Sequence, residues 1–338
     1  MEIPVLDLAA SSRAPDGALE WWREATVSFG ALQVVNHGVP DELRNACLRM
    51  AAEFHSKDEN VKARYAMSRS RGITGYLSPD PALKQDGSGR LVRDYASLDF
   101  GPESEPANGT VRSILLGPNA WPELPGFRAA VQAYRDAVHA CAVAVAGMLA
   151  RVCALPPDRL TRHATQGCSL LRLLHYPAPA QGREEPPNGH TDYEWFTLIV
   201  QTSPGLEILR PDGGRIAVPA RPDAITVLIG DLLEVLSGGY LESTLHWVRS
   251  REPDRYSLTY FFGPDFDDVV APESGNAVGD YPPLHAGHHL TALRVRHLAH
   301  LRSAVRDGEL ALAFDLPATN PLKAAKEQRL VASARRPE

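Results

Sequence analysis

The stretch NGHTDYEWFTLIVQ, residues 188–201, places a histidine and an aspartate directly before a β-prone apolar run. Side chains of an extended strand alternate between its two faces, so we expect His190 and Asp192 to point the same way. The pair is therefore either a buried hydrogen-bonded couple or two ligands aimed at one point. A pair with this spacing is common by chance, so a third ligand in the same sheet is needed to decide.

Short β-prone segments continue on both sides of this stretch, from residue 167 to residue 264, with turns such as SPG, PDGG and EPDR between them. The predicted strands are residues 168–176, 196–202, 206–211, 215–220, 224–236, 245–250 and 256–264. Many short strands at this spacing indicate a sandwich or barrel. A jelly roll is the version that closes around a small-molecule site.

The rest of the chain is predominantly helical. Apolar residues recur at helical spacing in residues 17–30, 40–57, 124–153 and 285–310. Residues 29–39 are a strand-like interruption. Residues 68–110 are rich in glycine, proline, serine and aspartate, and we expect them to loop over the surface.

This pattern predicts an α+β protein whose double-stranded β-helix (jelly-roll) core is flanked by N-terminal and C-terminal helices. We expect an N-terminal helical and strand region at residues 1–165, the core at 166–270 and a C-terminal helical segment at 271–338. The three segments should form one compact unit.

Composition excludes several classes of protein. The chain has 338 residues, 44% of them hydrophobic, and a net charge of −6, which argues against nucleic-acid binding. The longest apolar stretch, residues 139–155, is short for a membrane span and contains Arg151. The N-terminus has no signal-peptide pattern, and the four cysteines follow neither a CxxC nor a disulfide pattern. We therefore predict a cytoplasmic protein that binds neither nucleic acid nor membrane.

A candidate third ligand, His246, lies in the middle of a later predicted strand, in the sequence YLESTLHWVRS. Two imidazoles and one carboxylate on one side of a metal leave other positions open, which is typical of non-haem Fe(II) oxygenases. Zinc hydrolases also use two histidines and one carboxylate. The spacing alone does not separate the two metals.

The following strand carries Arg255 and Ser257, which alternation places on one face. Burial of a guanidinium inside a barrel costs free energy unless a carboxylate pairs with it. A ligand carboxylate that binds the guanidinium through both oxygens, next to the serine hydroxyl, suits Arg255 and Ser257. An exposed Arg255 after a turn is the alternative. A metal that can activate oxygen, next to a carboxylate clamp, suggests a keto acid co-substrate.

Other conspicuous polar residues have structural explanations. His285, His288 and His289 open a predicted helix, and we interpret them as a solvated helix start. His37 should make a hydrogen bond near a turn. Asp231 should stabilise the turn in which it lies.

The whole chain resembles the isopenicillin N synthase-like branch of the Fe(II)/2-oxoglutarate-dependent dioxygenases. The resemblance rests on the order and spacing of segments along nearly the full length. These segments are IPVLDL, FGALQVVNHGVP, RGITGY, LLGPNAWPELPGFRAAVQAY, LLRLLHYP, GHTDYEWFTLIVQTSPGLEIL, IGDLLEVLSGGYLESTLHWV and RYSLTYFFGPD.

The resemblance assigns roles to particular residues. The iron ligands, which are also the catalytic centre, would be His190, Asp192 and His246. The distal carboxylate of 2-oxoglutarate would be bound by Arg255 and Ser257, and the co-substrate would also be held by Tyr176. Leu174 stands where many members have asparagine, so this chain departs from the family at that contact.

The implied activity is oxidation of a small molecule with Fe(II), 2-oxoglutarate and O2, releasing succinate and CO2. Hydroxylation of an unactivated C–H bond, in specialised metabolism such as antibiotic biosynthesis, is the expected reaction. Alternatives are an isopenicillin N synthase-type oxidase or cyclase that consumes no 2-oxoglutarate, a zinc hydrolase, and a non-catalytic binding protein. The expected assembly is a monomer or homodimer.

The segment after the aspartate departs from the small residues that many family members have there. We expect Tyr193, Glu194, Trp195 and Phe262 to shape the substrate pocket. Strict alternation would turn Glu194 toward the metal side, where it would meet a substrate group or an internal arginine. Alternatively the strand bends, so that Glu194 reaches solvent or a surface arginine and Trp195 packs in the core.

Overall fold

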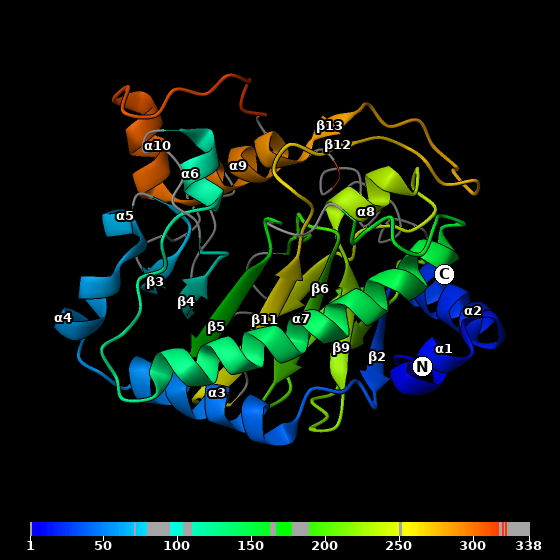
Figure 1. The fold of residues 1–338 in the computed structure, drawn as a ribbon, viewed down its shortest axis with the longest axis horizontal. Helices are drawn as coiled ribbons and strands as arrows, with labels where there is room; N and C mark the ends of the chain where they lie inside the picture. Colours follow the sequence, from blue (N-terminus) through cyan, green and yellow to red (C-terminus); the bar gives the residue numbers. More distant parts are fainter. Residues whose placement is uncertain are drawn as a thin grey trace, which may run out of the picture.

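The computed structural model describes residues 2–70, 72–79, 95–103, 110–162, 167–177, 189–249, 252–317, 320 and 322. An eight-stranded sheet, the major sheet, runs through the centre of the molecule (Figure 1). Its strands, in spatial order, are β1 (Val5–Asp7), β2 (Ala31–Val35), β9 (Ile225–Ile229), β6 (Phe196–Gln201), β11 (Arg255–Phe262), β5 (Leu170–Tyr176), β4 (Ala96–Phe100) and β3 (Gly75–Leu77).

Two long helices, α3 (Asp41–His55) and α7 (Phe127–Val152), cover one face of the major sheet (Figure 1). Alternation along β11 sends Tyr260 and Phe262 to this face, where both rings contact His139 of α7. The opposite face of β11 therefore carries Arg255, Ser257, Thr259 and Phe261. We call this opposite face of the sheet the inner face.

A three-stranded minor sheet packs against the inner face, with the order β10 (His246–Val248), β7 (Leu206–Leu209) and β8 (Arg215–Ala217). Ile199 and Leu228 of the major sheet share an apolar cluster with Leu206 and Ile208 of the minor sheet. Burial of these side chains between the two sheets holds them together. The predicted α+β fold with a jelly-roll core is confirmed.

Several predicted boundaries were wrong. The part of residues 68–110 that the structure describes is not only surface loop, because β3 and β4 extend the major sheet and β4 is fully buried. The predicted strand 224–236 ends at Ile229, and its second half is helix α8 (Asp231–Leu236). At the junction, a Cβ on Gly230 would lie 2.1 Å from the carbonyl oxygen of Glu194, so only glycine fits.

The C-terminal part follows the sheet as two helices, α9 (Ala286–His297) and α10 (Ala299–Arg306), which break at Leu298. Residues 124–153, which were expected to form one helix or two, contain the single helix α7. Within the described ranges, no helix is both long and apolar enough to cross a bilayer.

Candidate metal and co-substrate site

Three side chains from two segments of the chain converge on one point. His190, Asp192 and His246 each offer one ligand atom, and these atoms lie within 4.8 Å of one another. Their convergence has a backbone cause, because His190 and His246 pair as an isolated β-bridge with reciprocal N–H···O bonds of 3.0 and 2.9 Å. The chain brings together all three residues that the sequence singled out as metal ligands.

Neighbouring groups orient two of these side chains, His246 and Asp192. The Nδ1 atom of His246 lies 2.9 Å from the carbonyl oxygen of Thr244. A carbonyl only accepts, so Nδ1 carries the hydrogen and Nε2 keeps its lone pair for a metal. Thr197 donates its hydroxyl to Oδ2 of Asp192 at 2.5 Å, which leaves Oδ1 facing the two imidazoles at 3.7 and 3.9 Å.

The electrostatics favour an ionised carboxylate at this point. Burial acts to raise the pKa of Asp192, but the charges of His246 and His190 and the hydrogen bond from Thr197 outweigh it and lower the pKa. Asp192 and His246 are buried, whereas the His190 side chain is 41% exposed. The group of ligands is thus closed on one side and open on the other, as a site that admits further ligands requires.

Arg255 is the second element of the site and is 1% exposed. Its Nε donates to the Ser203 carbonyl at 3.1 Å and its Nη2 to Oε1 of Gln201 at 2.8 Å. Its Nη1 is buried and has no hydrogen-bond partner among the described residues. Burial lowers the pKa of Arg255. A buried guanidinium that pairs with no carboxylate in the described part of the chain, and that has an unused donor, fits the terminal carboxylate of an acidic ligand.

The other residues expected at this position surround Arg255. Tyr176 lies opposite it in the register of β5 and β11, and its ring is 4.7 Å from the guanidinium carbon. Ser257 lies on the same face as Arg255, and its hydroxyl donates to the Val200 carbonyl at 2.9 Å. Leu174 pairs with Ser257 across the strands and contributes an apolar side chain.

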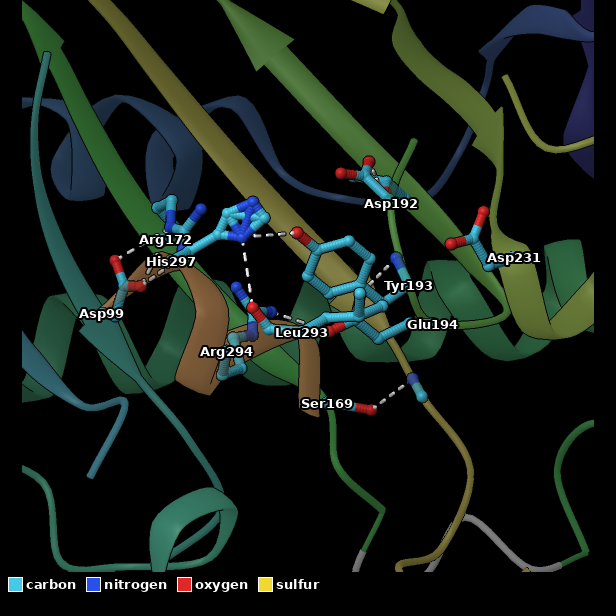
Figure 2. A network of polar contacts seen from close by, with 12 residues as sticks. Asp99, Ser169, Arg172, Asp192, Tyr193, Glu194, Asp231, Leu293, Arg294 and His297 are labelled. Atoms are coloured by element: carbon cyan, nitrogen blue, oxygen red, sulfur yellow. Dashed lines mark hydrogen bonds and ion pairs between the residues drawn. The ribbon is translucent and has the colours of Figure 1, made fainter. Parts of the chain in front are cut away.

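Residues 191–195 bend instead of continuing the strand, which begins at Phe196. The first N–H groups of α8 have no helical partner, so those of Asp231 and Leu232 bond to the carbonyls of Asp192 and Glu194. The bend turns Glu194 away from the metal side and toward α9, where Arg294 donates to its Oε1 at 2.9 Å (Figure 2).

Glu194 is therefore paired with an internal arginine, and it reaches neither solvent nor a surface arginine. Burial and the neighbouring Asp192 raise the pKa of Glu194 despite this partner. Tyr193 also turns toward α9, and its hydroxyl lies 3.2 Å from Nδ1 of His297 (Figure 2).

Two residues expected at the substrate pocket belong to the core. Trp195 and Phe262 are fully buried in the main hydrophobic cluster, and we do not retain them as substrate contacts. The physical reason for Phe262 is strand alternation, because Arg255 and Ser257 face the interior and Phe262 has the opposite parity. Phe261 is the aromatic residue on the inner face.

Sequence reasoning missed two further groups near the site. Asp99 of β4 and Arg172 of β5 form a buried bidentate ion pair, with N···O distances of 2.7 to 3.1 Å. Asn320 donates to Oδ2 of Asp231 at 2.6 Å and to the Thr191 hydroxyl at 3.3 Å. The ion pair of Asp99 with Arg172 could have been predicted only if residues 96–100 had been recognised as a strand of the sheet.

The other polar residues that the sequence analysis singled out have structural roles, and the expectation for one of them, His289, was wrong. His285 caps α9 by accepting from the His288 N–H, and His37 accepts from the Val39 N–H. His289, expected at a solvated helix start, is instead buried, and burial lowers its pKa to about 4. Asp231 begins α8 and is completely buried.

Two family models match the chain. Residues 167–264 match the 2OG-Fe(II) oxygenase superfamily, and residues 3–124 match the model described as non-haem dioxygenase in morphine synthesis N-terminal. The first match contains the three candidate metal ligands and Arg255.

Individual relatives agree with these models. The 2-oxoglutarate-dependent dioxygenase citB of Monascus ruber is 30% identical over 295 residues, covering 80% of this chain and 87% of the relative. The clavatol oxidase claD of Penicillium crustosum is 27% identical over 300 residues, covering 80% and 88%. The fold is similar to that of a full-length Neurospora crassa protein solved in complex with alpha-KG and thymine, with a TM-score of 0.74 and 23% identity over 88% of this chain and 97% of that one.

Proposed function

The chain belongs to the 2OG-Fe(II) oxygenase superfamily, and from this premise we propose that it hydroxylates a C–H bond of a small molecule in specialised metabolism. It is an Fe(II)- and 2-oxoglutarate-dependent dioxygenase that uses O2. The names of relatives, a clavatol oxidase among them, support a small-molecule substrate. The relatives named as 2-oxoglutarate-dependent dioxygenases favour hydroxylation with 2-oxoglutarate over an oxidase reaction that consumes none.

We assign the iron to His190, Asp192 and His246. The observation that carries the assignment is the open set of two imidazoles and one carboxylate with converging ligand atoms, which suits Fe(II). When bound, the metal supplies O2 activation coupled to decarboxylation of 2-oxoglutarate to succinate and CO2. Thr197 and the Thr244 carbonyl hold the ligands in orientation for it.

We assign the distal carboxylate of 2-oxoglutarate to Arg255, whose buried Nη1 has no partner among the described residues. Gln201 and the Ser203 carbonyl fix the guanidinium, so its unused N–H points in a set direction. Ser257 and Tyr176 lie next to it and complete the proposed cradle. The residues bind and orient the co-substrate, and the buried surroundings exclude water from it.

We further propose that residues 1–165, 166–270 and 271–338 fold as one unit and that the protein is a cytoplasmic monomer or homodimer. All four cysteines are free and buried, which agrees with a reducing compartment. Strands β1 to β4 lie in the same sheet as the strands of the proposed core, which supports a single folding unit.

The test is succinate formation from 2-oxoglutarate by the Fe(II)-loaded protein, with and without O2. We expect Asp192→Ala to abolish it and to weaken metal binding, measured independently by calorimetry with Mn(II). The matched control is Asp223→Ala, since Asp223 is exposed and its side chain forms an ion pair with the nearby Arg221. Full activity with Zn(II) in the absence of O2, or an active Asp192→Ala variant, would refute the assignment.

A further inference from the structure

Polar side chains from β4, β5, the segment that follows Asp192 and helix α9 lie in one region of the structure (Figure 2). Two ion pairs and one hydrogen-bonded pair compose this set, and we call it the polar cluster. Its members are Asp99, Arg172, Tyr193, Glu194, Arg294 and His297. The set adjoins the proposed metal site along the chain, because Tyr193 and Glu194 directly follow Asp192.

The strand register places part of the polar cluster on the inner face, where the co-substrate cradle also lies. Arg172 is opposite Asp99 on one side and opposite Thr259 on the other. Thr259 shares its face with Arg255 and Ser257 by alternation along β11. Arg172 therefore points into the barrel, on the same side as the proposed site.

Both arginines are fixed against one aromatic ring. The guanidinium carbons of Arg172 and Arg294 lie 5.1 and 5.7 Å from the centre of the Phe261 ring. Each also holds a carboxylate, Arg172 through two nitrogens on Asp99 and Arg294 through one on Glu194. Contacts on several sides preorganise both guanidiniums, since neither can move without losing an ion pair and a ring contact.

This arrangement is costly as a purely structural device. Two buried ion pairs in one region lose more hydration than well-packed apolar side chains would, and apolar replacements of such pairs are often more stable. Their position beside a proposed reaction centre gives a reason for them, which is recognition of a polar ligand.

The donors that remain unused show what such a ligand must present. Arg294 Nε is buried without a partner among the described residues. Arg172 bonds Asp99 through Nε and Nη2, and its Nη1 makes no hydrogen bond within the described ranges. His297 Nδ1 lies 3.1 Å from the Leu293 carbonyl oxygen, so Nδ1 carries a hydrogen and acts as a donor. The Tyr193 hydroxyl therefore accepts from Nδ1, and its own hydrogen is available to a ligand. The unused groups are therefore N–H and O–H donors, which require acceptor atoms on the ligand.

The charges decide between classes of acceptor. Arg172 is matched by Asp99 and Arg294 by Glu194, so the polar cluster has no cation left to neutralise an anion. A carboxylate entering it would be buried without a counter-charge, at a cost far above that of a neutral carbonyl.

We propose that the polar cluster is the substrate-recognition surface and that it binds an uncharged small molecule through carbonyl oxygens, with Arg172, Arg294 and Tyr193 as donors. This proposal rests on the proposed function, because it places the substrate beside the iron and 2-oxoglutarate. Phe261 forms the apolar floor between the two guanidiniums.

The test measures binding to the anaerobic protein saturated with Fe(II) and 2-oxoglutarate. The probes are two matched pairs, thymine with orotate and 2,4-dihydroxybenzaldehyde with 2,4-dihydroxybenzoate. Saturating 2-oxoglutarate keeps the carboxylate probes from Arg255. Dissociation constants come from calorimetry and from the change in the visible absorbance of the Fe(II)–2-oxoglutarate complex. We expect at least one uncharged probe to bind, and to bind at least tenfold more tightly than its carboxylate counterpart.

Variants then locate the interaction. We expect the double variant Arg172→Gln/Asp99→Asn, which removes both charges of the ion pair, to weaken binding of the uncharged probe at least tenfold while 2-oxoglutarate still binds. The control is Arg159→Gln/Glu273→Gln, which removes another bidentate Arg–carboxylate pair of 2.6 and 2.7 Å and should leave probe binding unchanged. Tyr193→Phe removes only one hydroxyl, and we expect a severalfold loss from it even if the double variant fails to fold.

The outcomes separate the two proposals. Failure of the wild-type protein to bind 2-oxoglutarate with Fe(II) would refute the proposed function itself. If 2-oxoglutarate binds but neither uncharged probe does, or the carboxylates bind as tightly, the substrate class is wrong. Equal losses in the Arg172 and Arg159 double variants would also overturn it, because the effect would then be one of general stability.

Discussion

The buried pair of Glu194 and Arg294 joins the segment that follows Asp192 to α9, so replacing one partner should be far more damaging than replacing both. Each side chain is almost fully buried and the two are 2.9 Å apart. Glu194→Met alone leaves a buried guanidinium unpaired, and Arg294→Met alone leaves a buried carboxylate unpaired. Each loss of one partner should cost about 3–5 kcal/mol.

In the double variant both charges are gone and two methionines fill the space against the rings of Tyr193 and Phe261, which Arg294 now covers. We expect its stability to lie within about 2 kcal/mol of the wild type. The coupling energy between the two sites should then be about 4 kcal/mol or more, above the roughly 0.5–3 kcal/mol usual for residues in contact.

The assay is urea unfolding of the four proteins, monitored by tryptophan fluorescence and circular dichroism, with thermal unfolding in support. For a chain of 338 residues, 3–5 kcal/mol corresponds to a fall in Tm of roughly 4–7 °C in each single variant. Additive effects, with coupling below about 0.5 kcal/mol, would refute the reasoning. They would mean that the pair is hydrated or that its partners act independently.

Three further predictions concern other positions. Arg255→Lys should raise the KM for 2-oxoglutarate by roughly ten- to a hundredfold in initial-rate assays of succinate, because it loses the forked contact; an unchanged KM would contradict the assignment. Burial lowers the pKa of His55 from 6.5 to about 3 in the folded protein. The neutral His55 side chain therefore contributes fully to the free energy of unfolding above pH 6.5. This contribution is lost as the pH falls below 6.5, by roughly 2 kcal/mol at pH 5. His55→Leu should flatten this part of the pH–stability curve in urea titrations, and an unaltered slope would exclude His55 as the cause. Asn320→Ala removes donors to Asp231 and Thr191 and should cost roughly 1–3 kcal/mol in unfolding free energy, whereas an unchanged value would show that the contact contributes nothing.

The sequence was informative where periodicity was undisturbed. Alternation along residues 255–262 correctly paired Arg255 with Ser257, and the same rule applied two steps further would have chosen Phe261 instead of Phe262. The helical periodicity of residues 127–152 likewise predicted α7 nearly in full. In both cases the local pattern and the tertiary environment require the same conformation.

Prediction was incomplete where tertiary contacts override the local pattern, because the bend after Asp192 and an internal arginine for Glu194 were expected only as alternatives. The bend at residues 191–195 exists because the first N–H groups of helix α8 bond to carbonyl groups of this segment. The sequence of the segment itself does not indicate that partner. The pairs of Glu194 with Arg294 and of Thr191 with Asn320 join residues about a hundred or more positions apart. Strand β4 was hidden by its short length and by the polar, glycine-rich segments around it, so Asp99 was missed as well.

The order of strands in the major sheet also constrains how the protein is made on the ribosome. Strand β2 pairs with β9, joining Leu32 to Val227 across 195 residues of chain. At a synthesis rate of roughly 5–20 residues per second, β2 waits about 10–40 s for its partner to emerge. During that interval an apolar strand edge is open to other chains. Slower initiation, lower temperature or added chaperones should therefore raise the soluble yield, and a fragment limited to residues 166–270 should aggregate, because β9 then never meets β2.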